Sequence, residues 1–241
     1  MSRNRALEVL AGSSLMAGLP RETVLSVLSR ASEKRCPDSA VVFREGEPAV
    51  AFFLVLEGRL KLTQTGADGH EVVIHFVGPG EATAALAVFS GAVYPVTASA
   101  VGLTCLLGWS HEVMRGLLLD QPVLALNALK LMSDRMREMQ ERFRELATER
   151  VGQRLARSLL RLARQTGRRT PEGVLIDQPI TREELAQMTG TTVFTVSRIL
   201  SVWETRGLVV SGRKRVLIRD PHGLVSIAED LPPSPPTAER V

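Results

Sequence analysis

The chain has 241 residues, 44% of them hydrophobic, which is enough for two compact domains with buried cores. Its formal net charge of +4 is unevenly distributed, because residues 1–150 carry 16 Lys and Arg against 17 Asp and Glu, whereas residues 151–241 carry 14 against 9. The two cysteines, Cys36 and Cys105, exclude a disulfide framework and an iron–sulfur cluster, and the lack of a signal peptide or a bilayer-spanning run predicts a cytoplasmic protein without a membrane partner.

The N-terminal part of the chain changes its hydrophobic period after two short helical patterns within residues 6–33. Between Val41 and Leu107, short apolar runs such as AFFLVLEGRLKLT and EVVIHFVGPGE are separated by Gly or Asp turns. Strands at such regular intervals are typical of a small antiparallel sandwich or roll. We therefore expect a β-roll over residues 1–113 and regard it as the candidate sensor domain.

A long amphipathic helix is predicted next, beginning at Pro122 and ending near Ala147. Its apolar residues recur at alternating spacings of four and three, which is the pattern of a coiled-coil seam. The seam consists of Ala125, Leu129, Met132, Met136, Met139, Phe143 and Leu146. It could pack against its own β-domain or against the same helix of a second copy. Because charged residues flank it on both sides, we favour a parallel homodimer and assign residues 114–150 to dimerisation.

The segment ITREELAQMTGTTVFTVSRIL, residues 180–200, has the spacing of a helix-turn-helix. Thr181 and Glu184 form a capping box, which predicts the start of a first helix. Gly190 lies where the chain must turn sharply, and Thr192 can cap a second helix. The packed face of that second helix follows a 3.6-residue period and consists of Val196, Ile199, Leu200 and Trp203.

The opposite face of the second helix is the candidate DNA-contact surface. Arg198 can donate two hydrogen bonds to guanine O6 and N7, and Phe194 or Val193 can lie against a thymine methyl group. The residues of the helix-turn-helix expected to contact DNA are Thr181, Thr192, Val193, Phe194, Thr195, Ser197, Arg198 and Ser201. The alternative is an ordinary helical hairpin in which Phe194 takes part in a contact between domains.

Two strand patterns, GLVVS and RVLIRD, enclose a basic turn after the helix-turn-helix. Together with the strand GVLIDQ and the amphipathic helix VGQRLARSLLRLARQTG, they predict a winged helix over residues 151–230. Arg213, Lys214 and Arg215 at the tip of the wing are placed to contact DNA phosphates, unless the turn is merely solvated. Residues 231–241 are Pro-rich and are expected to be disordered.

The expected fold class is α+β, with an N-terminal double-stranded β-helix or jelly roll, a long dimerisation helix and a C-terminal winged helix-turn-helix. Over residues 15–230 this layout resembles the cyclic-AMP receptor protein and fumarate–nitrate reductase regulator family of bacterial transcription factors. The match is most specific at residues 180–200. The resemblance implies a homodimer that binds two-fold related half-sites of double-stranded DNA and contacts RNA polymerase.

The chain departs from the family at the positions that hold cyclic AMP. Ala84-Ala85-Leu86 replaces the Gly-Glu-Leu that binds the ribose, and Tyr94-Pro95 replaces the Arg-Ser that binds the cyclic phosphate. The Thr-Ser pair that binds the purine falls on Met139-Gln140. Since a buried phosphate without a cation is unfavourable, we expect an effector other than cyclic AMP. The expected effector pocket comprises Ala84, Ala85, Tyr94, Pro95, Met139 and Gln140.

A second departure lies on the DNA-contacting helix. Arg198 matches the guanine-contacting arginine of the family, but Phe194 stands in place of a glutamate. A phenyl ring cannot accept a hydrogen bond from cytosine or adenine. The half-site is therefore expected to differ from the common family consensus at that base pair.

Other interpretations of the sensor domain stay open. His75 or His70 could ligate haem in a gas-sensing regulator, as in some members of the family, and the small residues Ala82–Ala87 could instead help to enclose an apolar ligand. The two histidines are five residues apart, so on a regular strand they point to opposite faces and cannot chelate one metal together. A β-roll metalloenzyme that uses the winged helix only for docking lacks its HxH spacing here, so we expect no catalytic residues.

Overall fold

The computed structural model describes residues 3–66, 69, 71–84 and 92–231. The chain forms two compact units, Met1–Met139 and Gln140–Val241, which are described separately. The tail that was predicted to be disordered lies outside the described residues from position 232 onward, as do His70 and Ala85. Within the described ranges, no helix is long and apolar enough to cross a membrane.

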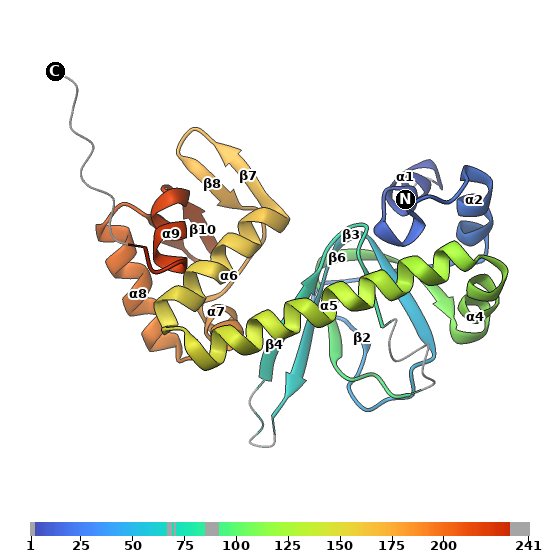
Figure 1. The fold of residues 1–241 in the computed structure, drawn as a ribbon, viewed down its shortest axis with the longest axis horizontal. Coiled ribbons are helices and arrows are strands. Elements are labelled where there is room, and N and C mark those ends of the chain that lie inside the picture. The colour runs from blue at the N-terminus through green and yellow to red at the C-terminus, as the bar shows by residue number, and fades with distance from the viewer. Residues whose placement is uncertain (1–2, 67–68, 70, 85–91, 232–241) are drawn as a thin grey trace. The chain divides into compact units, whose positions relative to one another are not determined.

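The first unit begins with short helices and continues into an antiparallel β-structure (Figure 1). The helices are α1 (Arg3–Ala11), the 3-10 helix η1 (Ser14–Met16) and α2 (Arg21–Ser29). The strands are β1 (Ser32–Cys36), β2 (Val41–Phe43), β3 (Ala51–Thr65), β4 (Glu71–Val77), β5 (Ala82–Thr83) and β6 (Thr97–Ser110). The apolar runs of the sequence predicted β2, β3, β4 and β6. They missed β1, because its residues are mostly polar and exposed.

The two long strands, β3 and β6, are the centre of this β-structure. They pair with each other, and each also pairs with two shorter strands, β4 and β5 on β3, and β1 and β2 on β6. Register shifts on both sides of Glu57 form bulges in the middle of β3, which bend the strand. Gly58 follows with a φ of 74°, and a Cβ there would collide with the backbone of Leu103 and Thr104. The predicted β-roll is confirmed.

Aromatic side chains attach the N-terminal helices to the roll. Trp109 on β6 is fully buried, and its Nε1 donates a hydrogen bond to the Val27 carbonyl oxygen of α2 at 2.9 Å. Its ring lies 5.9 Å from that of Phe52 on β3. The core therefore extends from the roll into α2.

Helix α4 (His111–Asp120) leads from the roll to α5 (Pro122–Thr148), the long helix predicted from the heptad pattern. α5 is continuous, as Figure 1 shows, and its ends agree with the predicted ends to within one residue. Its N-terminal turns are anchored to the roll, because Leu124 and Ala128 are buried in the same core. Asn127 adds two hydrogen bonds to backbone carbonyl groups of the N-terminal segment.

The second unit is a winged helix. Its helices are α6 (Val151–Thr166), α7 (Arg182–Thr189), α8 (Val193–Thr205) and α9 (Pro221–Ala228). Its strands are β7 (Gly167–Thr170), β8 (Gly173–Ile176), β9 (Val209–Gly212) and β10 (Arg215–Ile218), which form one antiparallel sheet in the order β7-β8-β10-β9. The three predicted strands are β8, β9 and β10. The sequence-based prediction missed α9, although its cap Asp220 and the following Pro221 are a helix-start signal.

Helix α6 connects the end of α5 to the core of this unit. Its predicted inward face is buried at Leu155, Leu159 and Leu162. Two arginines of α6 are half-buried in ion pairs. Arg161 lies 2.6 Å from Glu145 on α5, and Arg157 lies 3.1 Å from Glu149. These pairs fix the C-terminal end of α5 to the winged helix.

Candidate nucleic-acid interface

The helix-turn-helix consists of α7, a left-handed turn and α8. The Thr181 hydroxyl accepts a hydrogen bond from the Glu184 N–H at 3.0 Å, and the Glu184 carboxylate accepts one from the Thr181 N–H at 2.8 Å. Gly190 has a φ of 62°, and the Thr192 hydroxyl accepts a hydrogen bond from the Thr195 N–H at 3.2 Å. The predicted capping box, glycine turn and second cap are all confirmed.

The apolar face of α8 sets the orientation of the helix. Val196 and Leu200 are fully buried, Trp203 is almost fully buried and Ile199 is half-buried. Ala186 on α7 is also buried, as expected for a small residue where two helices cross closely. This orientation, which the 3.6-residue period predicted, turns the remaining residues of α8 outward.

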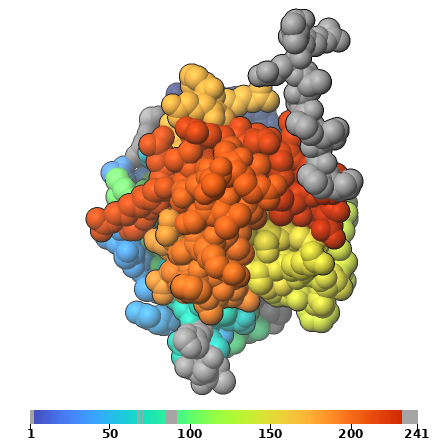
Figure 2. All heavy atoms as spheres, turned by 90° about the vertical axis from the view of Figure 1, so that its left-hand side faces the viewer, coloured from blue at the N-terminus to red at the C-terminus, as the bar shows by residue number. Residues whose placement is uncertain are grey.

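The outward residues of α8 lie in the middle of the face that Figure 2 shows. Phe194 is 78% exposed and Val193 is 44% exposed, although both are apolar. Arg198 and Ser201 are exposed too, whereas Thr195 and Ser197 are half-buried. The helix therefore presents a guanidinium group, hydroxyl groups and an apolar patch on one surface.

The wing is the hairpin of β9 and β10, and its two-residue turn is Arg213-Lys214. Lys214 has a φ of 56°, in the left-handed region that costs a residue with a Cβ about 1–2 kcal/mol. Its carbonyl oxygen accepts a hydrogen bond from the Ile180 N–H at 3.3 Å, which ties the turn to the segment before α7. Arg213, Lys214 and Arg215 are all exposed.

A shallow depression lies between the wing and the start of α7. It is lined by Thr181, Arg182, Gly212, Arg213 and Lys214. Three of these five residues carry a positive charge, so the depression suits a phosphate group. Arg182 was not among the residues predicted from the sequence, because its position beside the wing depends on the pairing of distant segments in the folded unit.

A hydrogen-bonded network joins the wing to both helices of the helix-turn-helix. The Glu204 carboxylate on α8 accepts hydrogen bonds from the Ser211 N–H at 2.7 Å and from the Ser211 hydroxyl at 2.6 Å. Arg182 donates to the Ser211 hydroxyl at 3.2 Å and to the Ser197 hydroxyl at 3.3 Å. The hydrogen bonds from Ser211, with the charge of Arg182, hold the pKa of Glu204 below its usual value. The network fixes the wing relative to α8.

The turn of the helix-turn-helix also contacts the end of α5. A Cβ on Gly190 would lie only 3.0 Å from the Leu146 side chain. Arg154 on α6 donates to the carbonyl oxygen of Thr189 at 2.9 Å and to that of Glu149 at 2.6 Å. The end of α5, the start of α6 and the turn before α8 therefore form one packed body.

The predicted coiled-coil seam is an exposed apolar row along α5. Its exposed members are Leu129, Met136, Met139, Phe143 and Leu146, with Phe143 at 75%, while Met132 is half-buried. Leu129, Met136 and Met139 belong to the same unit as the β-roll and are still exposed. The alternative in which these residues pack against their own β-domain is therefore wrong.

The described positions that the sequence resemblance matched to the cyclic-AMP contacts carry no cation. Tyr94 is 3% exposed, and its hydroxyl both donates to and accepts from the backbone of Ala51 at 3.0 Å. Its ring stacks on Phe43 with centroids 4.1 Å apart, so its side chain belongs to the core of the roll. Ala84 is half-buried with a φ of 66°, and Pro95 is exposed. Met139 and Gln140 are exposed on α5.

The environment of His75 differs from the regular strand assumed above. Leu62 of β3 pairs with His75 and the next residue, Thr63, pairs with Val73, so the register shifts at Ile74 and β4 forms a bulge there. Side chains therefore do not simply alternate along β4. Arg135 Nη1 on α5 lies 2.6 Å from His75 Nε2, and since a guanidinium group only donates, Nε2 acts as the acceptor. In the described part of the chain, no three His, Cys, Asp or Glu side chains are grouped as a metal site.

Comparison with known proteins gives matches in both units. A cyclic nucleotide-binding domain matches residues 33–121, and a Crp-like helix-turn-helix domain matches residues 153–227. A cyclic AMP receptor protein of Thermus thermophilus is 32% identical over 91% of this chain and 99% of its own length. A CRP-like cAMP-activated global transcriptional regulator of Mycobacterium tuberculosis is 26% identical over 90% of this chain and 97% of its own.

A solved structure has the same fold. The structure of FixK2 from Bradyrhizobium japonicum covers 82% of this chain and 96% of its own, with a TM-score of 0.73 and 21% identity. The relative from Mycobacterium tuberculosis is named as a transcriptional regulator. The chain belongs to the cyclic-AMP receptor protein and fumarate–nitrate reductase regulator family, and it is a DNA-binding transcription regulator with a cyclic nucleotide-binding domain.

Proposed function

We propose that the protein is a homodimeric, sequence-specific regulator that places α8 of each copy in the major groove of one half-site. The outward face of α8 is the observation that carries this proposal, because it combines Arg198 with hydroxyl groups and the apolar pair Val193 and Phe194. These groups match the donors, acceptors and methyl groups of base edges. The wing residues Arg213, Lys214 and Arg215 then contact phosphates and fix the register.

The apolar row on α5 supports the homodimer. A row of large apolar side chains exposed over several turns of one helix is unfavourable in water and is covered when two helices pair. Pairing through residues 114–150 relates the two copies of α8 by a two-fold axis. The expected half-sites are then about 34–36 Å apart, which is one turn of DNA. A complex with RNA polymerase also belongs to this proposal.

We propose further that the effector is not cyclic AMP. Tyr94 occupies a position where the family holds the cyclic phosphate, and both hydrogen-bonding functions of its hydroxyl are used by Ala51. A phosphate group there would lack a cation and a free donor. Calorimetric titration of the full chain with cyclic AMP is expected to give no heat above that of dilution.

A haem-dependent gas sensor is the alternative that we favour less. His75 Nε2 already accepts a hydrogen bond from Arg135, and Glu81 lies 3.8 Å from the same nitrogen. Iron ligation through Nε2 would have to break this contact with α5. An absorbance scan of the freshly purified protein tests the alternative directly, since bound haem gives a Soret band.

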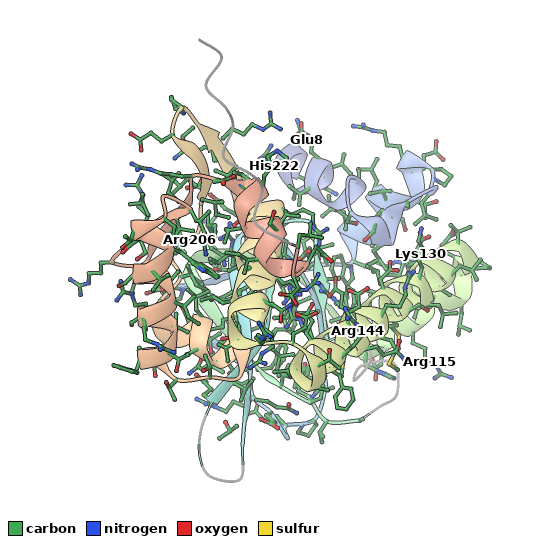
Figure 3. The ribbon with its side chains drawn as sticks, turned by 60° about the vertical axis from the view of Figure 1, so that its left-hand side comes forward. Glu8, Arg115, Lys130, Arg144, Arg206 and His222 are labelled. Atoms are coloured by element: carbon green, nitrogen blue, oxygen red, sulfur yellow. The ribbon has the colours of Figure 1, made fainter. Side chains whose placement is uncertain are left out.

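The base-contact assignment is tested with Arg198→Ala on a duplex selected from a random pool and on its single-base variants. The loss of a bidentate contact with guanine is expected to cost about 1–3 kcal/mol and to relax the preference at one base pair. Arg206→Ala is the matched control, because Arg206 is exposed at the C-terminal end of α8 (Figure 3) and its loss should leave the base preferences unchanged. Full affinity and selectivity in Arg198→Ala would show that the assignment is wrong.

A further inference from the structure

We propose that Phe194 makes the choice of DNA site depend on a pyrimidine 5-methyl group. At one base pair of the half-site, the regulator then binds thymine or 5-methylcytosine and discriminates against unmethylated cytosine. The inference rests on the proposed function, in which the outward face of α8 enters the major groove. It adds the chemical class of the base that Phe194 contacts.

Phe194 and Val193 form an apolar patch in the first turn of α8. Their exposure of 78% and 44% leaves most of the phenyl ring in water. The neighbouring hydroxyl groups of Thr192 and Thr195 are engaged with each other at 3.0 Å, and the Thr192 hydroxyl also accepts a hydrogen bond from the Thr195 N–H. The patch therefore offers van der Waals contact and no hydrogen bond.

The charges around this patch indicate that its occupant is a nucleic acid. The exposed residues from Thr192 to Val202 include Arg198 but no Asp or Glu. The one carboxylate on α8, that of Glu204, accepts hydrogen bonds from Ser211. An apolar patch with a cationic border suits a polyanion that displays apolar groups, which describes the major groove of DNA.

Only one kind of apolar group is displayed on the major-groove edge of a base pair. This is the 5-methyl group of thymine, whereas cytosine and adenine present amino donors and guanine presents acceptors. A phenyl ring pressed against a polar edge leaves that edge without a hydrogen-bond partner, which is unfavourable. Cytosine methylated at C5 carries its methyl group at the same ring position as thymine. The patch should therefore accept both methylated bases.

The position of Arg198 locates the methyl group relative to guanine. Phe194 and Arg198 are four residues apart, so they are neighbours on one face of α8, with Cβ atoms about 5–6 Å apart. Stacked bases on one strand are about 3.4 Å apart. Phe194 is therefore expected to contact a base one or two steps from the guanine that Arg198 contacts.

The test uses the full chain and the half-site selected from a random pool. Each thymine of the half-site is replaced in turn by deoxyuridine, which removes only the methyl group, and each cytosine by 5-methylcytosine. At one position, deoxyuridine is expected to weaken binding about fourfold, the effect of one buried methyl-sized group. Changing that pair from T·A to C·G should weaken binding as well, and methylation of the new cytosine should restore about the same factor.

Variants at position 194 assign the effect to the phenyl ring. Phe194→Ala should bind the thymine and deoxyuridine duplexes equally, and Phe194→Leu should keep most of the preference, since it keeps an apolar side chain. Phe194→Glu should prefer cytosine to thymine at that position, because its carboxylate can accept a hydrogen bond from the cytosine amino group. Val225→Ala is the matched control, because Val225 is an exposed apolar residue of α9, and this variant should keep the full methyl effect.

The outcomes separate the inference from the proposed function. If no sequence is enriched from the pool, the proposed function fails and the inference fails with it. If sequences are enriched but deoxyuridine is tolerated at every position, only the inference is overturned. The inference on Phe194 would also be overturned if Phe194→Ala still bound the thymine duplex more tightly than the deoxyuridine duplex.

Discussion

Lys214 combines an unfavourable backbone conformation with an exposed charge at the tip of the wing. Asparagine adopts a positive φ more readily than lysine, so Lys214→Asn should keep the turn and remove only the charge. We expect this variant to bind all DNA sequences more weakly by a similar factor. The slope of log K against log salt concentration should fall by about 1, because one phosphate contact is lost. Titrations at several salt concentrations measure both effects, and a loss confined to the selected site would contradict the phosphate assignment.

Single residues were predictable from the sequence where both partners of an interaction are close in the chain. The capping box of Thr181 and Glu184 and the left-handed turn at Gly190 are such local signals, and both are confirmed. The network of Arg182, Glu204 and Ser211 was not predictable, since its members come from α7, α8 and β9 and meet only in the folded unit. The contact between Arg135 and His75 was missed for the same reason, because 60 residues separate the partners.

At the scale of elements, the wing should be held to α8 in a pH-dependent way. Since the hydrogen bonds of Ser211 lower the pKa of Glu204 in the folded state, the ionised carboxylate stabilises the fold above the ordinary pKa of 4.5. This stabilisation is lost as the pH falls through the lowered pKa. Denaturant titrations from pH 6 to pH 3 should therefore show a smaller loss of unfolding free energy in Glu204→Gln than in the unaltered chain. Glu183→Gln, an exposed change on α7, is the control.

Ser211→Ala tests the same attachment without changing a charge. It removes the hydroxyl that donates to Glu204 and accepts from Arg182, but keeps the backbone hydrogen bond. We expect a loss of about 0.5–1.5 kcal/mol in unfolding free energy. Hydrogen exchange in β9 and β10 should become faster while exchange in α6 changes little. Equal acceleration throughout the second unit would contradict a local role of the network.

The seam on α5 is tested by a charged substitution in its middle. Met136→Glu would place two carboxylates next to each other across the two-fold axis of the proposed dimer, so the dimer should dissociate at micromolar concentration. Sedimentation velocity measures the change. Lys130→Glu is a strict control, because it changes the net charge more than Met136→Glu does. Lys130 is an exposed residue of α5 (Figure 3) that does not belong to the seam. A monomeric unaltered chain, or an unchanged dimer in Met136→Glu, would refute the pairing.

Elements with strong periodicity were predicted well, and elements held by long-range pairing were not. α5 and α8 follow their heptad and 3.6-residue patterns, because the spacing of apolar residues along the chain is sufficient to define each helix. β1 lacks an apolar pattern and forms because its backbone pairs with β6, more than 60 residues away. The bulge at Ile74 also depends on how β4 pairs with β3, and the sequence of β4 alone does not specify that register.

At the scale of the whole molecule, the two units differ in how closely their sequence follows the family. The winged helix has the capped helix-turn-helix that the sequence predicted, and Phe194 is the departure from the family that we expect there. The roll keeps the fold, but Tyr94, which we expect at the family's phosphate-binding position, is built into its core. DNA recognition could therefore be predicted from residues, whereas the effector could not, because its pocket is defined by groups that the chain has replaced.

Paired binding of α8 to two half-sites is tested by selecting binding sites from a random DNA pool with the full chain and then counting the protein copies on the selected duplex. We expect a two-fold symmetric sequence with half-sites about 10–10.5 base pairs apart, bound by two copies. Each half-site should contain the guanine that is lost from the preference of Arg198→Ala. Enrichment of no sequence, or of a single unpaired half-site bound by one copy, would show that the protein does not bind DNA as a homodimer.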